Sequence, residues 1–159
     1  MAANFDPPAR RGELLAIEQL SVRHHPRSAA AAMLISGWLA SRLGWQTEPL
    51  REGPDGLAGR VLGDDREVAV QLRAAPELSV PGLESVTLEV KGGRSLTLQR
   101  GPGGLHASSR EQDGSRREWT VPGASRGETG VLGEGIRQAL LRDPTYIPAL
   151  QAARVLAAT

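Results

Sequence analysis

The sequence predicts an α+β fold: an antiparallel β-meander sheet with helices packed on one face and two helices at the C-terminus. Apolar residues recur at helical spacing between positions 31 and 39, at alternate positions through residues 57–121, and at helical spacing again between 132 and 155. Strands and helices therefore occupy separate stretches of the chain, as in α+β domains. The length of 159 residues suits one hydrophobic core, so we expect residues 1–159 to form a single domain.

The chain is expected to begin with a short helix and a strand. Asp6 before Pro7 is typical of an N-cap followed by a first-turn proline, which predicts a helix over residues 7–15. Leu20 and Val22 then alternate with polar neighbours, which predicts a half-buried strand over residues 17–23.

The next element is an amphipathic helix that ends near Gly44. Ser28 can cap its start, with His25 before Pro26 as the alternative. Gly44 suits the left-handed residue that ends a helix, and Trp45 would then fold back onto the last turn. The expected buried face consists of Ala31, Leu34, Ile35, Trp38 and Leu39, and the opposite face carries Ser36, Ser41 and Arg42.

Gly37 lies inside this predicted helix, where glycine costs roughly 1 kcal/mol relative to alanine. We interpret it as a position that permits close packing of the helix against a sheet. Trp38 is expected to seal the helix to that sheet.

Between Trp45 and residue 121 the apolar period is two. Gly92-Gly93 and Asp113-Gly114 are typical of tight hairpin turns, and Gly63-Asp64-Asp65 predicts another turn. Residues 74–81 are expected to form an irregular connection. The predicted strands cover residues 57–62, 68–72, 86–90, 96–98, 105–110 and 117–121.

Two helices are predicted after the sheet. Ser125 and Glu128 have the spacing of a capping box, and Asp143-Pro144 ends the first helix and caps the second. Their expected apolar stripes are Leu132, Ile136, Ala139 and Leu140 in the first, and Tyr146, Ile147, Leu150 and Val155 in the second.

Composition excludes several classes of protein. The chain has no cysteine, which excludes disulfides and thiolate chemistry and fits a cytoplasmic setting. The net charge is +1 and aromatic residues make up 3%, so we expect no nucleic-acid partner. No apolar run approaches the ~20 residues of a membrane span, and the N-terminus lacks a signal-peptide core, so no membrane partner is expected.

No catalytic, cofactor or metal site is predicted. His24 and His25 are adjacent and His106 is distant, which fits no chelating spacing. Asp64-Asp65 suits turn geometry, and the serines lack a nucleophile-elbow context. Gly127, Gly130, Gly133 and Gly135 are dense but lack the lysine and hydroxyl residue of a phosphate loop.

The candidate partner-binding residues are Trp119, Arg117 and His106. Trp119 lies in the last predicted strand, and His106 should lie across the Asp113-Gly114 turn from it. Tryptophan and arginine are enriched among the residues that dominate protein interfaces. If Trp119 faces outward it could anchor a partner; the alternative is that it belongs to the core of the sheet.

Three segments together carry a family resemblance. They are Phe5-Asp6-Pro7-Pro8-Ala9-Arg10, the stretch from Leu34 to Trp45 that reads LISGWLASRLGW, and Arg142-Asp143-Pro144-Thr145-Tyr146-Ile147-Pro148-Ala149-Leu150. In this order they resemble the C-terminal domain of the glucose-6-phosphate dehydrogenase assembly protein family, OpcA. The central strands match only in general character.

The resemblance implies a non-catalytic protein that assembles or allosterically activates glucose-6-phosphate dehydrogenase in the oxidative pentose phosphate pathway. It also implies that an N-terminal domain of the family is missing from this chain. The rival hypothesis is a ligand-binding domain for a sugar phosphate or nucleotide, which the arginine content and the glycine cluster favour.

Overall fold

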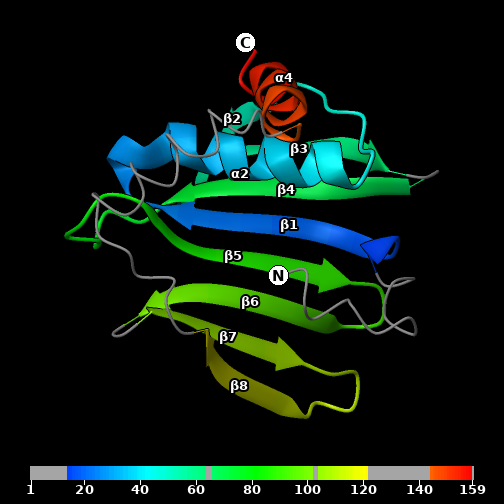
Figure 1. Cartoon of the computed structure of the whole chain (residues 1–159), viewed down its shortest axis with the longest axis vertical. Helices are drawn as coiled ribbons and strands as arrows, with labels where there is room; N and C mark the ends of the chain where they lie inside the picture. Colours follow the sequence, from blue (N-terminus) through cyan, green and yellow to red (C-terminus); the bar gives the residue numbers. More distant parts are fainter. Residues whose placement is uncertain (1–13, 64–65, 102–103, 122–143, 159) are drawn as a thin grey trace.

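The computed structural model describes residues 14–63, 66–101, 104–121 and 144–158. Within them, eight strands form one sheet in the order β2-β3-β4-β1-β5-β6-β7-β8 (Figure 1). The same residues hold two α-helices, α2 (Ala29–Arg42), which follows a 3-10 turn η2 (Pro26–Ser28), and α4 (Tyr146–Leu156). The strands are β1 (Ile17–His24), β2 (Arg51–Gly53), β3 (Gly56–Gly63), β4 (Arg66–Ala74), β5 (Leu83–Val90), β6 (Arg94–Gly101), β7 (Gly104–Arg110) and β8 (Arg116–Val121).

The expected α+β class is confirmed in broad terms, but the sheet is mixed rather than a pure antiparallel meander. β1 lies between β4 and β5, parallel to β4 and antiparallel to β5. The chain leaves β1 through α2 and returns through the β2–β3 hairpin, and a crossover of this kind is what parallel pairing requires. Alternation within a single strand does not indicate which distant strand it pairs with, so the sequence did not predict the parallel pairing of β1 and β4. Strand β2 was not predicted.

The hairpin signals of the sequence are confirmed. Gly92 and Gly93, between β5 and β6, have φ of 94° and 79°, and Gly114, between β7 and β8, has φ of 82°. These left-handed values suit glycine, which has no side chain to strain there. The predicted helix over residues 7–15 lies outside the described residues except for its last two positions. The helix predicted between Ser125 and Asp143, the glycine cluster and Asp64-Asp65 also lie outside them.

Helix α2 is buried on more sides than its apolar pattern predicted. It contacts β1 and β4 on one side and α4 on another (Figure 1). Ser36, expected on the solvent side, is 1% exposed and donates its hydroxyl hydrogen to the Ala32 carbonyl at 2.8 Å. Leu34, expected in the core, is 40% exposed. The predicted face was wrong at these two positions, because α2 is packed both against the sheet and against α4, and a single apolar stripe does not describe a helix covered on two sides.

The end of α2 is formed as predicted, and its start is not. Gly44 has φ of 69°, and the N–H of Trp45 bonds to the Ala40 carbonyl at 2.9 Å. Ser28 makes no side-chain cap and instead accepts the Gly82 N–H at 2.8 Å. His25 provides the cap, because its Nδ1 accepts the Arg27 N–H. The histidine alternative therefore holds for η2, which leads into α2, and α2 itself has no side-chain cap.

Trp45 packs over Gly63, and this contact leaves no room for a larger residue. A Cβ atom added at Gly63 would lie 2.6 Å from Cδ1 of Trp45. We expect Gly63→Ala to lower the free energy of unfolding by about 1–3 kcal/mol, because the buried indole must shift. Urea unfolding measures this, with Gly53→Ala as the control, since its nearest atom would be 3.5 Å away. Equal losses in the two variants would contradict the packing explanation.

Gly37 permits close packing, but its partner is α4 and not the sheet. A Cβ atom there would lie 2.5 Å from the Ala149 carbonyl oxygen and 2.6 Å from the Ala153 nitrogen. Helix α4 accordingly buries Ala149, Ala153 and Leu156. Its predicted stripe was wrong in this respect: Tyr146, Ile147 and Val155 are 58%, 57% and 40% exposed. Small residues form the contact because two helix backbones can then approach closely.

Candidate functional site

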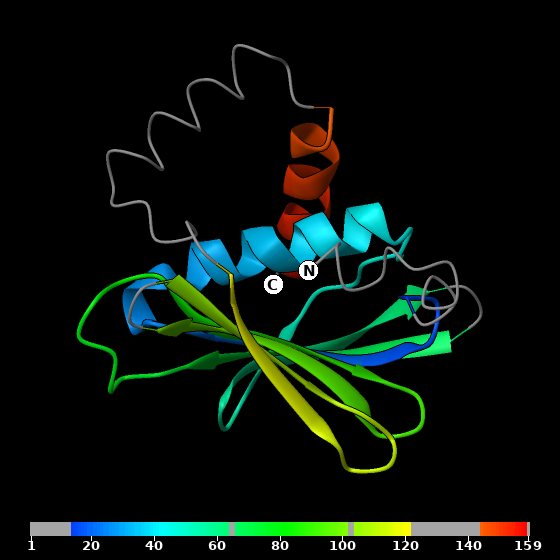
Figure 2. The same cartoon turned by 60° about the horizontal axis from the view of Figure 1, so that its bottom comes forward.

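The β7–β8 hairpin forms one end of the sheet, and its two faces differ in chemistry. Figure 2 shows the helices above the sheet, with β8 at the front end of the strand series. Side chains on neighbouring strands line up in rows across the sheet, and alternate rows belong to opposite faces. Rows on the helix side are apolar through β4, β1 and β5, whereas those on the outer side are polar.

Trp119 ends one of the apolar rows. The row runs through paired residues, with exposures of 1% at Leu72, 0% at Val22 and 8% at Val86 in the middle of the sheet. It continues outward through Leu98 and Ala107, which pairs with Trp119 on β8. Trp119 is 36% exposed, so the row that begins in the core ends in a tryptophan at the surface.

Arg117 ends the neighbouring row on the same face. It pairs with Ser109, which is 7% exposed and follows Leu96 and Leu88 across the sheet. Trp119 and Arg117 are two positions apart on one strand, so their side chains emerge side by side. The structure therefore brings these two predicted residues to one face of the hairpin.

His106 belongs to the outer face, opposite that of Arg117. It pairs with Gln99 on β6 and Thr120 on β8. Its ring lies directly against Gly101, where an added Cβ atom would overlap the imidazole carbon Cδ2. His106 lies across the turn on the strand opposite Trp119, as the sequence predicted, but its direct partner is Thr120. Successive residues of a strand face opposite sides of the sheet, so His106 and Trp119 lie on different faces.

A shallow hollow of about 390 Å³ lies over β6, β7 and β8. His106 and Trp119 both line it, and Arg117 does not. Most of the other lining residues are polar side chains of the outer face. The lining consists of Gln99, His106, Ala107, Ser108, Arg116, Glu118, Trp119 and Thr120.

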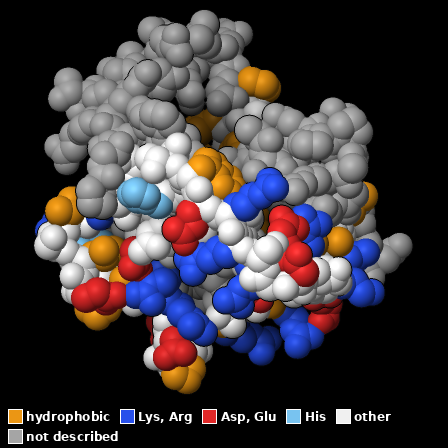
Figure 3. All heavy atoms as spheres, turned by 90° about the horizontal axis from the view of Figure 1, so that it is seen from below, with side chains coloured by type: hydrophobic (Ala, Val, Ile, Leu, Met, Phe, Trp, Pro, Cys, Tyr) orange, Lys and Arg blue, Asp and Glu red, His pale blue; other side chains and the backbone are white. Residues whose placement is uncertain are grey.

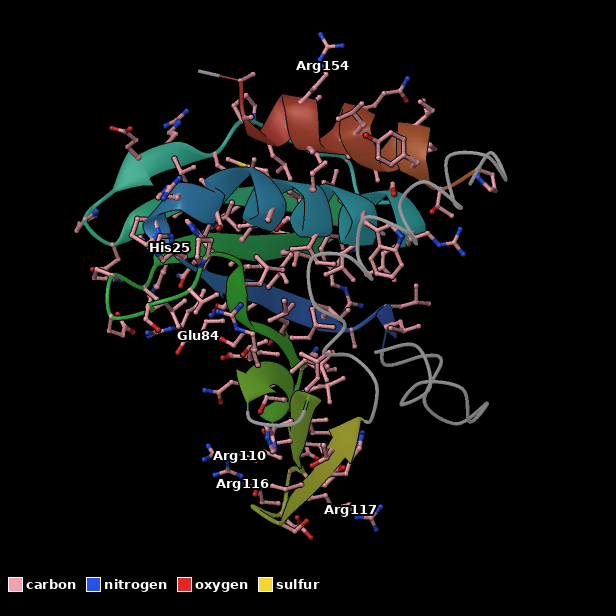
Figure 4. All side chains as sticks on the ribbon, turned by 60° about the vertical axis from the view of Figure 1, so that its left-hand side comes forward. His25, Glu84, Arg110, Arg116, Arg117 and Arg154 are labelled. Carbon is pink, nitrogen blue, oxygen red and sulfur yellow. The ribbon has the colours of Figure 1, made fainter. Side chains whose placement is uncertain are left out.

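Arginines gather at the closed end of the hairpin. Arg110 on β7 pairs directly with Arg116 on β8, so two positive charges stand opposite each other on the outer face. Figure 4 shows the Arg110 and Arg116 side chains on one side of the hairpin and Arg117 on the other. Neither Arg110 nor Arg116 was predicted as a site residue, because counting outward from a two-residue Asp113-Gly114 turn pairs Arg110 with Arg117. In the structure the Glu111 N–H bonds to the Ser115 carbonyl, and this closure makes Arg116 the partner of Arg110.

The acidic residues near this end are already engaged. Glu111 Oε2 lies 2.6 Å from Arg94 Nη2, and Glu118 Oε1 lies 2.8 Å from Arg116 Nε. Asp113 belongs to the turn, where the Ser115 hydroxyl and backbone N–H hold the pKa of its carboxyl below the usual value. The Asp113 carboxylate therefore accepts hydrogen bonds from Ser115 within the turn.

The histidines do not form a metal site within the described part of the chain. Nδ1 of His24 lies 2.8 Å from the His25 carbonyl oxygen, and His25 caps η2. Across the described residues, no group of three or more His, Asp or Glu side chains could hold a metal ion. Among these same residues, no helix is long and apolar enough to cross a bilayer.

Comparison with known proteins identifies the family. The sequence profile of a family described as the C-terminal domain of a glucose-6-phosphate dehydrogenase subunit matches residues 1–150. The chain belongs to this family. The resemblance drawn from the tryptophan helix and the two ends of the chain is thereby confirmed.

Three curated relatives of this family are cyanobacterial, and each carries the name "Putative OxPP cycle protein OpcA". The Synechococcus elongatus protein is 42% identical over 86 residues, which cover 52% of this chain and 19% of the relative. The Nostoc punctiforme protein is 34% identical over 83 residues, which cover 50% and 18%. The Synechocystis protein is 43% identical over 44 residues, which cover 28% and 9%. The matched segments thus span about a fifth or less of each relative.

Proposed function

We propose that this member of the family is a non-catalytic binding module of glucose-6-phosphate dehydrogenase. Membership of the family and the names of its relatives, which refer to the oxidative pentose phosphate cycle, support this role. The structural observation that carries the proposal is the exposed end of the apolar row at Trp119, with Arg117 beside it.

Trp119 serves in this proposal as the anchor of the contact. A tryptophan that is 36% exposed has apolar area left to bury against a partner, at a contribution of roughly 25 cal/mol per Å². Arg117 adds hydrogen-bond donors on the same face, and His106 on the outer face lies within the adjoining hollow. A partner that contacts both faces of the hairpin around the edge strand β8 would bind Trp119, Arg117 and His106 together.

Activation would follow from differential affinity. A binding module changes the activity of its partner only if it binds the active or assembled form more tightly than the inactive one. Couplings of this kind are typically about 1–3 kcal/mol, or roughly 5–150-fold. The rate of the dehydrogenase should therefore rise with the concentration of the chain and saturate as the complex fills.

The substitution Trp119→Ala tests the anchor. We expect binding to the cognate dehydrogenase to weaken by roughly fivefold or more, since truncation of such an anchor typically costs above ~1 kcal/mol. Binding is measured by titration with the purified enzyme, and stability by urea unfolding of the same variant. Activation of the enzyme should fall in parallel with binding.

Tyr146→Ala is the matched control, because Tyr146 is an aromatic residue that is 58% exposed on α4, outside the hairpin. It should bind as the wild type does. A Trp119→Ala variant that lost stability as a core variant does, with binding lost only in proportion to unfolding, would make Trp119 a core residue instead. Absence of any complex with the wild-type chain would contradict the proposed function itself.

A further inference from the structure

We propose that the outer-face arginines at the closed end of the β7–β8 hairpin, Arg110 above all, bind a carboxylate-rich surface of the dehydrogenase. This inference rests on the proposed function, and it names the chemistry of the partner surface. The observation that motivates it is the direct cross-strand pairing of Arg110 with Arg116. Like charges directly opposite each other destabilise an antiparallel pair.

The chain itself does not neutralise this pair fully. Arg116 has Glu118 as its ion-pair partner, and Glu111 is held by Arg94. Arg110 makes no ion pair in the described part of the chain. Along its own outer-face row the next acidic residue is Glu89, reached through Ser95 on β6. Two strand spacings separate Arg110 from Glu89, about 10 Å, which is too far for a direct pair.

Protection of the sheet edge does not account for Arg110. Natural sheets place charges on edge strands to prevent edge-to-edge association, and this explains Arg116, Arg117 and Glu118 on β8. Arg110 lies instead on β7, which has β6 on one side and β8 on the other. A charge there gives no edge protection, and it leaves the hairpin with an unfavourable pair.

The arrangement suits carboxylates on a folded partner. A guanidinium presents a planar set of donors that matches a carboxylate in two parallel hydrogen bonds. Arg110 and Arg116 project on the same side, so acidic side chains of a partner could bridge them and remove their repulsion (Figure 4). Figure 3 views the molecule from this end and shows Lys and Arg side chains gathered there, with Asp and Glu side chains among them.

Charge reversal at Arg110 separates binding from stability. Arg110→Glu places a carboxylate opposite Arg116, an arrangement that favours the hairpin. We expect its melting temperature to match or exceed that of the wild type, while binding to the dehydrogenase weakens by roughly tenfold at low salt. The loss should lie mainly in the association rate, and the dependence of that rate on salt should decrease.

Arg154→Glu is the matched control, because it makes the same change in net charge on an exposed position of α4, at the far end of the molecule (Figure 4). Its binding should stay within about twofold of the wild type, since exposed charges further apart than about 10 Å are largely screened at 0.1 M salt. Both variants are titrated with purified dehydrogenase at low salt and again at about fourfold higher salt.

The outcomes are distinct. Equal weakening by Arg110→Glu and Arg154→Glu would show a general charge effect and overturn the inference. Wild-type affinity in Arg110→Glu, together with weak binding by Trp119→Ala, would also overturn the inference. The proposed function would stand in that case. If the wild-type chain formed no complex with the dehydrogenase, both the proposed function and this inference would be wrong. If a phosphate polymer bound the wild-type chain and displaced the dehydrogenase, with loss of that binding in Arg110→Glu, the partner chemistry would be phosphate rather than carboxylate.

Discussion

Replacement of Leu20 by alanine should lower the free energy of unfolding by about 2–5 kcal/mol. Leu20 is 0% exposed and lies on the central strand β1, between Val70 on β4 and Leu88 on β5. Val70 and Leu88 lie on strands that are hydrogen-bonded to a neighbour on each side. Their backbones are therefore held in place and cannot move into the space left by the lost side chain. The cost therefore includes the cavity as well as the lost transfer free energy.

The matched control is Leu62→Ala, which removes the same atoms from a strand residue that is 44% exposed. It should change stability by no more than about 0.5 kcal/mol. Urea unfolding followed by circular dichroism gives both values, and the slopes should agree between variants. A loss at Leu20 no larger than at Leu62 would mean that the core does not centre on β1.

Replacement of Gly37 by leucine should lower the free energy of unfolding by about 3 kcal/mol or more, at the upper end of overpacking effects. The first added carbon alone would lie within 3 Å of three atoms of α4, two of them backbone atoms of Ala149 and Ala153. Helix propensity acts in the opposite direction, because leucine is favoured over glycine by about 0.8 kcal/mol. A net loss therefore measures the packing of α4 on α2.

Ala30→Leu is the control, since Ala30 is an exposed position of the same helix. It should leave stability nearly unchanged. Amide hydrogen exchange locates the effect: exchange in Tyr146–Leu156 should accelerate in Gly37→Leu, while the β1 amides change less. A Gly37→Leu variant as stable as the wild type would show that α4 is not held closely on α2.

The helices and the candidate partner-binding site lie at different parts of the sheet. Helix α2 contacts β1 and β4 in one half of the sheet and α4 packs on α2, whereas the candidate site lies on β6, β7 and β8 in the other half. Variants in the α2–α4 contact should therefore test the fold, and variants in the hairpin should test the partner surface. The Trp119 and Arg110 experiments rely on this separation.

Sequence periodicity was sufficient for local structure. Alternation identified seven of the eight strands among the described residues, Gly44 indicated the end of α2, and Asp113-Gly114 indicated the hairpin between β7 and β8. These features depend on residues close together in the chain, whose backbone preferences and spacing act locally. Trp119, Arg117 and His106 were chosen on the same basis, and their role in binding stays a proposal.

The amino-acid sequence by itself determined the α+β class, the hairpins, the helix stop and the family. Only the tertiary structure decided that β1 inserts between β4 and β5, that Gly37 faces α4, and that Arg110 stands opposite Arg116 on the hairpin that exposes Trp119. The physical reason is that burial and charge repulsion depend on neighbours distant in the chain. Periodicity shows that a residue has an apolar or polar side, but the packed partner determines which side is covered.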